Sequence, residues 1–304
     1  HHLLGIKRYF SCMLNNRIAI GSVQFGIPYG VANTSSKEVS NSEISNILTY
    51  ANSVGINTID TAIAYGESER KLGDYGVSNC QVITKLPKIP KECSNVLSWV
   101  EGQLMESLSR LRLPRIYGLL LHNTKDLSTS KGEELWSAMQ FLQKKKLIHK
   151  IGYSIYKPED LDTFYDVFLP DIVQAPYSVL DQRLASSGWL DRLFNAQTEI
   201  HVRSVFLQGL ILMSKIERPN KFDRWHSLFE KFDLWLEDNN LNAMQASISF
   251  AINDPRITKV ILGVDNLFQL KEIMSSVNIK AQNFPEDLSI QDTDLIDPSR
   301  WNLL

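Results

Sequence analysis

The chain contains little cysteine and no long apolar run, and each absence excludes a class of protein. Its 304 residues include only three cysteines, Cys12, Cys80 and Cys93, which are too few and too irregularly spaced for a disulfide framework or a metal site. A reducing cytoplasm is therefore the expected location. The longest apolar stretches, such as 119–121 and 210–213, fall far short of the roughly 18 residues that a membrane span needs.

An excess of charge of one sign is also missing. The 32 basic and 34 acidic residues give a net charge of −2, so the sequence offers no overall attraction to nucleic acid or to an anionic membrane. His149, His201 and His226 have no further ligand at metal-binding spacing, so no metal is predicted. A small molecule is the expected partner, and the sequence leaves monomer and homo-oligomer both open.

No Ser-, Gly- or Pro-rich linker divides the chain, which favours a single domain. The opening His1-His2-Leu3-Leu4 is unusual for a native protein, and Met13 looks like a better initiation point. We therefore expect residues 1–12 to be an expression remnant and residues 13–304 to form the domain.

Short apolar runs alternate with longer amphipathic segments along the whole chain. One helical pattern opens at Asn41 and ends before Gly55, and another runs from Cys93 to Pro114. Eight strands alternating with helices over about 250 residues predict an α/β fold of the (β/α)8 TIM barrel type. A doubly wound open sheet would show the same alternation, but no G-x-G-x-x-G follows the first run. The runs are 17–20, 56–60, 81–85, 116–122, 150–154, 172–174, 200–204 and 259–263.

Polar residues suited to acid–base chemistry lie at or just after three consecutive runs. Asp60 ends the second run and Tyr65 follows it, Lys85 ends the third, and His122 ends the fourth. Taken singly, an Asp before a loop is usually a turn residue and a Lys at a strand end is usually a solvated terminus. Neighbouring strands of a parallel barrel bring all four to its C-terminal mouth, where such barrels carry out chemistry.

The same segment resembles the signature of the aldo-keto reductases, a family of nicotinamide-dependent barrel enzymes. The matching residues are Asp60-Thr-Ala, Tyr65-Gly and Ser68-Glu-x-x-Leu-Gly. The family also has a lysine at the end of the third strand and a histidine at the end of the fourth, as Lys85 and His122 stand here. The resemblance covers residues 17–301, is weakest over 210–240, and implies reduction of an aldehyde or ketone, sugar-derived carbonyls included, to an alcohol.

The resemblance implies that Tyr65 is the general acid that protonates the developing alkoxide. A free tyrosine titrates near pH 10, so it needs a neighbouring cation that stabilises its phenolate. Lys85 would supply that cation, and Asp60 would keep Lys85 charged. His122 would donate a hydrogen bond to the substrate oxygen and orient the carbonyl.

Several later positions resemble the family's dinucleotide site. Gln174 matches a glutamine that clamps the nicotinamide carboxamide, and Ser154 matches the first residue of a Ser-Asn pair, although Ile155 replaces the Asn. Arg203 stands where the family often has an aromatic residue that stacks on the nicotinamide, and its guanidinium plane can still stack or contact the pyrophosphate. The other predicted cofactor residues are Ser204, Gly263, Asp265, Gln269 and Glu272.

The resemblance favours NADP(H) as the cofactor, and NAD(H) is the alternative. The basic residue that many relatives use for the 2'-phosphate is absent, and the acidic Asp265 stands in that region. A carboxylate near a phosphomonoester costs Coulomb energy, which argues for NAD(H).

The segments 21–30, 203–209 and 296–301 look like a bacterial branch of the family often met among surface-polysaccharide proteins. We expect the substrate pocket to include Gln24, Phe25, Tyr29 and Trp301, although single aromatic residues more often pack in the core. Two other interpretations stay open. One is a non-catalytic, cofactor-sensing barrel that regulates a partner, and the other is a sugar isomerase or epimerase that needs no added nicotinamide.

Overall fold

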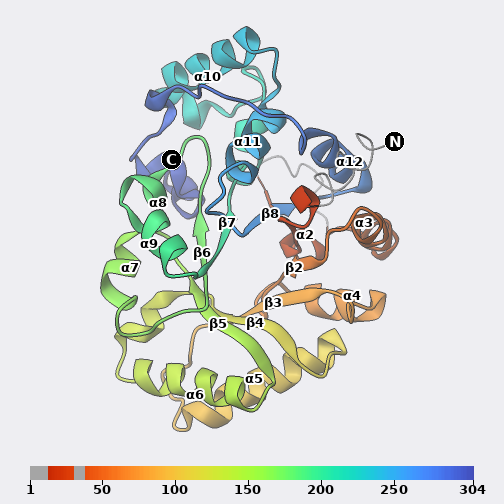
Figure 1. Cartoon of the computed structure of the whole chain (residues 1–304), viewed down its shortest axis with the longest axis vertical. Helices are drawn as coiled ribbons and strands as arrows, with labels where there is room; N and C mark the ends of the chain where they lie inside the picture. The colour runs from red at the N-terminus through yellow and green to blue at the C-terminus, as the bar shows by residue number, and fades with distance from the viewer. Residues whose placement is uncertain (1–12, 31–37) are drawn as a thin grey trace.

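Eight parallel strands form a closed barrel in the computed structural model, which describes residues 13–30 and 38–304 (Figure 1). Each strand pairs with the next in the chain, and the last pairs with the first. The prediction of a (β/α)8 barrel is therefore confirmed, whereas the remnant expected at residues 1–12 lies outside the described residues. The strands are β1 (Ile18–Gly21), β2 (Thr58–Asp60), β3 (Gln81–Leu86), β4 (Ile116–Leu121), β5 (Ile148–Ser154), β6 (Ile172–Pro176), β7 (Glu199–Arg203) and β8 (Lys259–Gly263).

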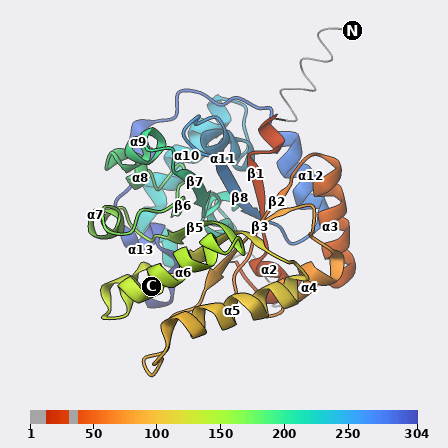
Figure 2. The ribbon, with the colours of Figure 1, turned by 60° about the horizontal axis from the view of Figure 1, so that its bottom comes forward.

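Helices surround the strands, as Figure 2 shows. The outer helices are α3 (Asn41–Ser53), α4 (Ser68–Tyr75), α5 (Val96–Leu111), α6 (Gly132–Lys144), α7 (Glu159–Phe164), α9 (Trp189–Asn195), α11 (Ala243–Ile252) and α12 (Leu267–Ser276). Additional helices lie in the connections: α2 (Val23–Gly26), α8 (Arg183–Ser186), α10 (His226–Asp238) and α13 (Thr293–Ile296). Five 3-10 turns complete the described part of the chain: η1 (Thr124–Ser128), η2 (Leu207–Leu212), η3 (Asn220–Trp225), η4 (Glu286–Leu288) and η5 (Pro298–Leu303).

The helix starts follow local capping chemistry. Ser40 precedes α3 and accepts a hydrogen bond from the Glu43 N–H, and Asn266 caps α12 in the same way. Apolar residues at helical spacing on α3, such as Ile44 and Ile47, are buried in the main core. That core lies between the strands and the outer helices, so the helical period in the sequence determines which face of each helix packs on the barrel.

Inside the barrel, apolar side chains fill the lumen below its mouth. Ile83, Leu120 and Ile172 form a separate buried cluster. They come from β3, β4 and β6, and β6 is not a neighbour of β3, so these side chains meet across the lumen. Gly118 leaves room for them, because a Cβ there would lie 3.0 Å from Ile83 and 3.1 Å from Ile172. The lumen below the mouth is therefore filled by packed side chains.

A second apolar cluster is built by η2, η3, α10 and the C-terminal segment. Trp301 belongs to it: its ring packs edge-on against Phe222 at a centroid distance of 4.9 Å, and its Nε1 donates to the Leu295 carbonyl oxygen at 2.9 Å. This cluster anchors the long connection after β7 to the end of the chain, and α10 stands at the top of Figure 1.

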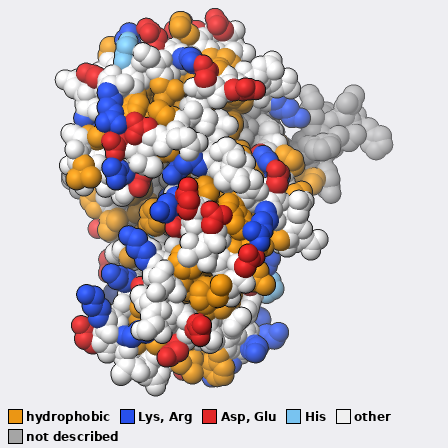
Figure 3. All heavy atoms as spheres, turned by 90° about the vertical axis from the view of Figure 1, so that its left-hand side faces the viewer, with side chains coloured by type: hydrophobic (Ala, Val, Ile, Leu, Met, Phe, Trp, Pro, Cys, Tyr) orange, Lys and Arg blue, Asp and Glu red, His pale blue; other side chains and the backbone are white. Residues whose placement is uncertain are grey.

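The molecular surface matches the balanced composition. On the face in Figure 3, acidic and basic side chains are interspersed among polar and apolar ones. None of the helices in the described part of the chain combines the length and the apolar character needed to cross a membrane.

Candidate active site

The ends of β2, β3 and β4 bring the four predicted catalytic residues together. Lys85 Nζ donates to Asp60 Oδ2 at 2.7 Å and to the Thr61 carbonyl oxygen at 2.8 Å. The same Nζ lies 5.1 Å from the centre of the Tyr65 ring, and the Tyr65 and His122 rings meet edge-on at 5.7 Å. A cation, a carboxylate, a phenol and an imidazole therefore share one small region.

Asp60 and Lys85 form a buried ion pair, with 5% and 1% of their surfaces exposed. Burial of the Lys85 ammonium disfavours its charge, but the Asp60 carboxylate outweighs this effect and the pKa of Lys85 is raised. The second oxygen of Asp60, Oδ1, accepts from Gln174 Nε2 at 2.8 Å. Lys85 is thus cationic at neutral pH, and Asp60 links it to β6.

His122 is neutral at physiological pH. Burial of its ring, and then the positive charge of Lys85, lower the pKa of His122 to about 4. A neutral imidazole has one N–H donor and one acceptor nitrogen, so His122 can donate a hydrogen bond without carrying charge.

The Tyr65 loop is held close to α2 by two glycines. A Cβ on Gly26 would lie 1.7 Å from the Tyr65 carbonyl oxygen, so only glycine allows this approach. Gly66 follows Tyr65 with a φ of 54°, in the left-handed region that favours glycine. In the Tyr65-Gly66 pair of the signature, the glycine thus allows the backbone conformation that follows the tyrosine, and the tyrosine carries the predicted chemistry.

A cavity of about 990 Å³ opens over this cluster at the C-terminal ends of the strands. It extends from the catalytic residues to α12, where Gln269 and Glu272 line its wall. Lys85 does not line the cavity, because it is buried against Asp60. Thirteen predicted residues line it: Gln24, Tyr29, Asp60, Tyr65, His122, Ser154, Gln174, Arg203, Ser204, Gly263, Asp265, Gln269 and Glu272.

Two predicted pocket residues do not line this cavity. Phe25, in α2 directly after β1, has no exposed surface and packs in the main core. Trp301 is buried in the second apolar cluster, where its indole N–H is satisfied by a backbone carbonyl. The structure thus places both rings in apolar clusters and not at the cavity wall, because burial of a large aromatic ring in a nearby core is favourable.

Ile155 and Arg203, the two residues that depart from the family pattern, contact each other. Arg203 Nη2 donates to the Ile155 carbonyl oxygen at 2.9 Å, and the Arg203 guanidinium lies 4.9 Å from the centre of the Tyr156 ring. The Ile155 side chain itself is buried in the main core. Position 155 therefore contributes a backbone acceptor that holds Arg203 at the cavity wall.

The β8 end of the cavity presents polar groups that suit a dinucleotide. Gln24 packs on Gly263, where a Cβ would lie 2.4 Å from the amide nitrogen, and Gln24 Oε1 is a buried acceptor with no partner among the described residues. The Asp265 N–H donates to Gln269 Oε1 at 2.8 Å, and burial raises the pKa of Asp265. An unpartnered amide oxygen and an extended cavity fit a bound cofactor with hydroxyl and amide groups.

Several other residues of the cavity were not among the predicted site residues. Tyr156 faces Arg203, and Gln208 Nε2 donates to the Tyr29 hydroxyl at 3.1 Å. Asp297 and Ser299 reach the cavity from the C-terminal segment. Tyr156 lies in a loop without a motif, whereas the other three belong to the branch-like segments 203–209 and 296–301. Only the path of each loop over the mouth shows that these side chains line the cavity.

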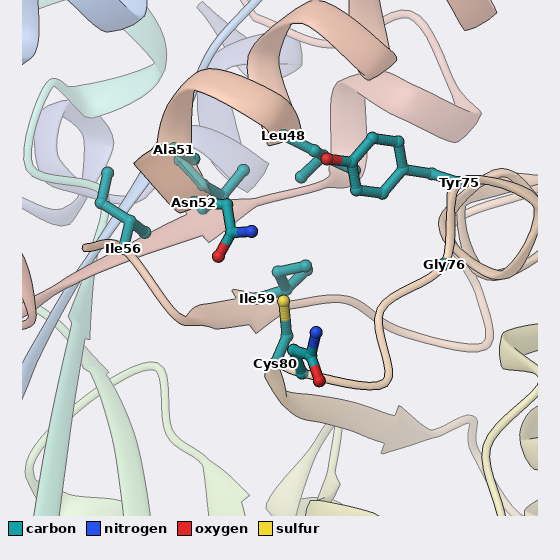
Figure 4. A pocket seen from close by; sticks show the side chains of 10 residues that line it. Leu48, Ala51, Asn52, Ile56, Ile59, Tyr75, Gly76 and Cys80 are labelled. Atoms are coloured by element: carbon teal, nitrogen blue, oxygen red, sulfur yellow. The ribbon is translucent and has the colours of Figure 1, made fainter. Parts of the chain in front are cut away.

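A second, smaller cavity of about 250 Å³ lies outside the barrel, between α3 and the loop after α4 (Figure 4). Its walls include Leu48, Ile56 and Ile59, and burial raises the pKa of the Cys80 thiol at its edge. This cavity offers no acid–base pair. Over residues 13–30 and 38–304, no group of three His, Cys, Asp or Glu side chains could hold a metal ion.

Comparison with known proteins identifies the family. The model of the aldo/keto reductase family matches residues 17–288. The uncharacterized oxidoreductase C28F2.05 of Schizosaccharomyces pombe is 26% identical over 267 residues, which cover 82% of this chain and 86% of that protein. The chain therefore belongs to the aldo/keto reductase family and is an oxidoreductase enzyme.

Solved structures share the fold. The aldo-keto reductase AKR11C1 from Bacillus halodurans, in its holo form, has a TM-score of 0.70 at 17% identity, with 88% of each chain covered. The glycerol dehydrogenase AKR11B4 from Gluconobacter oxydans has a TM-score of 0.68 at 19% identity, with the same coverage of 88% for each chain. A putative aldo-keto reductase from Pseudomonas aeruginosa has a TM-score of 0.63 at 20% identity, covering 86% of this chain and 89% of that one.

Proposed function

We propose that this protein reduces an aldehyde or ketone to an alcohol with a reduced nicotinamide dinucleotide. The observation that carries the proposal is the buried Lys85 ammonium held between the Asp60 carboxylate and the Tyr65 ring, directly under a cavity of about 990 Å³. The resemblance to the surface-polysaccharide branch supports sugar-derived carbonyls as the substrates to test. A cytoplasmic location stays a prediction.

The proposed chemistry divides between the cofactor and the side chains. The nicotinamide ring, when bound, supplies the hydride for the carbonyl carbon. Tyr65 passes its phenol proton to the carbonyl oxygen, and Lys85 stabilises the phenolate that remains. Asp60 keeps Lys85 charged, and His122, being neutral, donates a hydrogen bond that orients the carbonyl.

The residues that would hold the cofactor lie along β5 to β8. Ser154 and Gln174 would bind the nicotinamide carboxamide, and Arg203 would pack on the ring or contact the pyrophosphate. Ser204, Gly263, Gln269 and Glu272 would line the path toward α12. The family resemblance favours NADP(H), whereas the carboxylates of Asp265 and Glu272 favour NAD(H), because a 2'-phosphate beside them would be repelled.

Cofactor titration is the direct test of the binding site. The purified protein is titrated with NADPH and with NADH, following quenching of tryptophan fluorescence. Tighter binding of one identifies the cofactor, and that cofactor is then used in a screen of sugar-derived carbonyls. If folded protein bound neither, the reductase proposal would be abandoned.

The role of Tyr65 gives a prediction with a matched control. Tyr65→Phe is expected to bind the cofactor like the wild type while kcat falls by about 10²- to 10⁴-fold, because only the proton donor is removed. Tyr75→Phe, which removes a hydroxyl at the small second cavity, should keep wild-type turnover. Full activity of Tyr65→Phe would show that another group is the acid.

A non-catalytic, cofactor-sensing barrel is the second candidate, and the Ile155–Arg203 contact favours it. The two residues in contact stand where the family has the Asn of its Ser-Asn pair and a stacking aromatic residue, both at the nicotinamide end. Such a protein would bind the dinucleotide but show no loss of reduced-cofactor absorbance with any carbonyl. A sugar isomerase or epimerase would instead act without added nicotinamide.

A further inference from the structure

Three fully buried hydroxyl side chains connect the loops around the proposed active site. Ser22 follows β1, Thr61 follows β2, and Ser68 begins α4; none of them has any exposed surface. Thr61 Oγ1 lies 3.1 Å from Ser68 Oγ, and Ser68 Oγ lies 2.8 Å from Ser22 Oγ. Ser22 Oγ then donates to the Asp60 carbonyl oxygen at 2.8 Å. The hydroxyl chain thus begins and ends at adjacent residues, Thr61 and Asp60.

The direction of this chain follows from the chemistry of its end. A carbonyl oxygen can only accept, so Ser22 donates to Asp60, Ser68 donates to Ser22, and Thr61 donates to Ser68. The Ser22 carbonyl oxygen, 2.9 Å from Ser68 Oγ, is a second acceptor for the same proton. Removing one hydroxyl would leave a buried neighbouring polar group without a hydrogen-bond partner. This destabilises the protein more than the loss of a solvent-exposed hydrogen bond does.

The chain is linked to both the cation and the acid of the proposed reaction. Lys85 Nζ donates to the Thr61 carbonyl oxygen at 2.8 Å, so the place of the ammonium depends on Thr61. In the middle of the hydroxyl chain, the backbone N–H of Ser68 donates to the Tyr65 carbonyl oxygen at 3.0 Å. Thr61 and Ser68 therefore bracket the loop that carries Tyr65 and tie its two ends together.

We propose that Thr61, Ser68 and Ser22 are positioning residues that set the separation between Lys85 and Tyr65. The inference rests on the proposed function, in which Tyr65 gives up a proton beside Lys85. Attraction between an ammonium and a phenolate falls as their distance grows. Loosening the loop would therefore weaken this attraction and slow proton transfer from Tyr65, while leaving the cofactor contacts near α12 unchanged.

The chain offers matched variants for the test. Thr61→Val removes the hydroxyl and keeps the shape of the side chain, whereas Thr61→Ser keeps the hydroxyl. Ser68→Ala breaks the middle of the chain. Ser247→Ala is the control, because Ser247 is equally buried but its hydroxyl has no partner within the described residues.

The first measurement needs neither cofactor nor turnover. Phenolate absorbance is followed against pH in each variant, and the same titration with Tyr65→Phe added is subtracted, which isolates Tyr65 from the other tyrosines. Thr61→Val and Ser68→Ala are expected to move this difference signal to higher pH, because the ammonium would lie farther from the phenolate. Thr61→Ser and Ser247→Ala should match the wild type.

Kinetics provide the second measurement. Thr61→Val and Ser68→Ala should lower kcat by about tenfold or more with cofactor affinity nearly unchanged, since small misplacements of reacting groups cost this much. An unshifted Tyr65 midpoint in both variants overturns the inference, whatever their melting temperatures. If Ser68→Ala does not fold, the Thr61→Val and Thr61→Ser pair decides alone. If the two variants shift the signal as expected but the wild type reduces no carbonyl, the proposed function is contradicted and the positioning inference stands.

Discussion

At the scale of single residues, His122 shows how burial determines the form of a side chain. Its ring is packed against Tyr65 and lies near the Lys85 cation, and both burial and that charge disfavour protonation. Histidine titrates near pH 6.5 in an unfolded chain. The lowered pKa thus makes His122 a neutral hydrogen-bond donor, and it also links proton uptake to unfolding.

This link predicts an acid-dependent loss of stability. Because the pKa of His122 is lowered to about 4, the unfolded chain binds more protons than the folded one between about pH 6.5 and pH 4. Stability is therefore complete above pH 6.5 and is lost as the pH falls through this window. Urea unfolding at pH 7 and pH 4.5 should show that the wild type loses about 2 kcal/mol more than His122→Gln. The exposed His149→Gln should lose as much as the wild type; equal losses in all three proteins would contradict the prediction.

At the scale of elements, Glu69 joins α4 to β3 and α5. Its buried carboxylate accepts from Thr84 Oγ1 and Ser107 Oγ, each at 2.6 Å, and from Arg110 Nε at 2.8 Å. Thr84 precedes Lys85 in β3, so the first turn of the helix after Tyr65 is attached to the strand that carries the proposed cation. The Ser-Glu pair of the signature thus connects α4 to β3 and α5 through the Glu69 carboxylate.

Removing the charge of Glu69 should weaken this connection. Glu69→Gln is expected to lower the free energy of unfolding by about 2 to 4 kcal/mol, because charge-assisted bonds are lost and buried donors are left poorly paired. Glu106 contacts the same arginine at 3.8 Å but is exposed, so Glu106→Gln should change stability by less than about 0.5 kcal/mol. Denaturant unfolding of both variants measures the two losses of stability. Equal losses would contradict the prediction that the buried Glu69 carboxylate stabilises the fold more than the exposed Glu106.

At the scale of the whole molecule, Glu199 ties strands together at the end of the barrel opposite the mouth. It stands at the start of β7 and accepts from Tyr117 of β4 and Lys150 of β5, each at 2.5 Å, while His201 Nε2 lies 2.9 Å from its second oxygen. Burial of the Glu199 carboxylate opposes its charge, but these hydrogen bonds outweigh burial and lower its pKa to about 2. One carboxylate thus holds three strands of the closed sheet.

Glu199 should therefore support the barrel until strongly acidic pH. Its stabilisation is fully present above the unfolded pKa near 4.3 and is lost as the pH falls toward 2. Glu199→Gln is expected to be less stable than the wild type by about 2 kcal/mol at pH 7, and this difference should shrink between pH 4.5 and 2. Thermal unfolding across this range measures it, with the exposed Glu237→Gln as the control. A difference that does not depend on pH would show that the carboxylate charge is not what holds the strands.

The sequence by itself determined the fold class and the family. The alternation of apolar runs and helical patterns predicts a parallel α/β architecture. A buried strand appears in the sequence as a short continuous apolar run, and an amphipathic helix as apolar residues at helical spacing. The signature around Asp60 and Tyr65, with Lys85 and His122 at later strand ends, needs only the strand order to bring the side chains to one mouth. Each of these features lies within a short stretch of sequence, so the sequence alone was sufficient to predict the fold class and the family.

Only the tertiary structure decided which other side chains face the cavity. Phe25 and Trp301 look like pocket walls in the sequence, yet both are buried, while Tyr156 lines the cavity without any motif to mark it. The hydroxyl chain from Thr61 through Ser68 to Ser22 joins residues up to 46 positions apart. Such contacts depend on loop paths and on competition for burial, which are properties of the packed molecule and leave no periodic trace in the order of its residues.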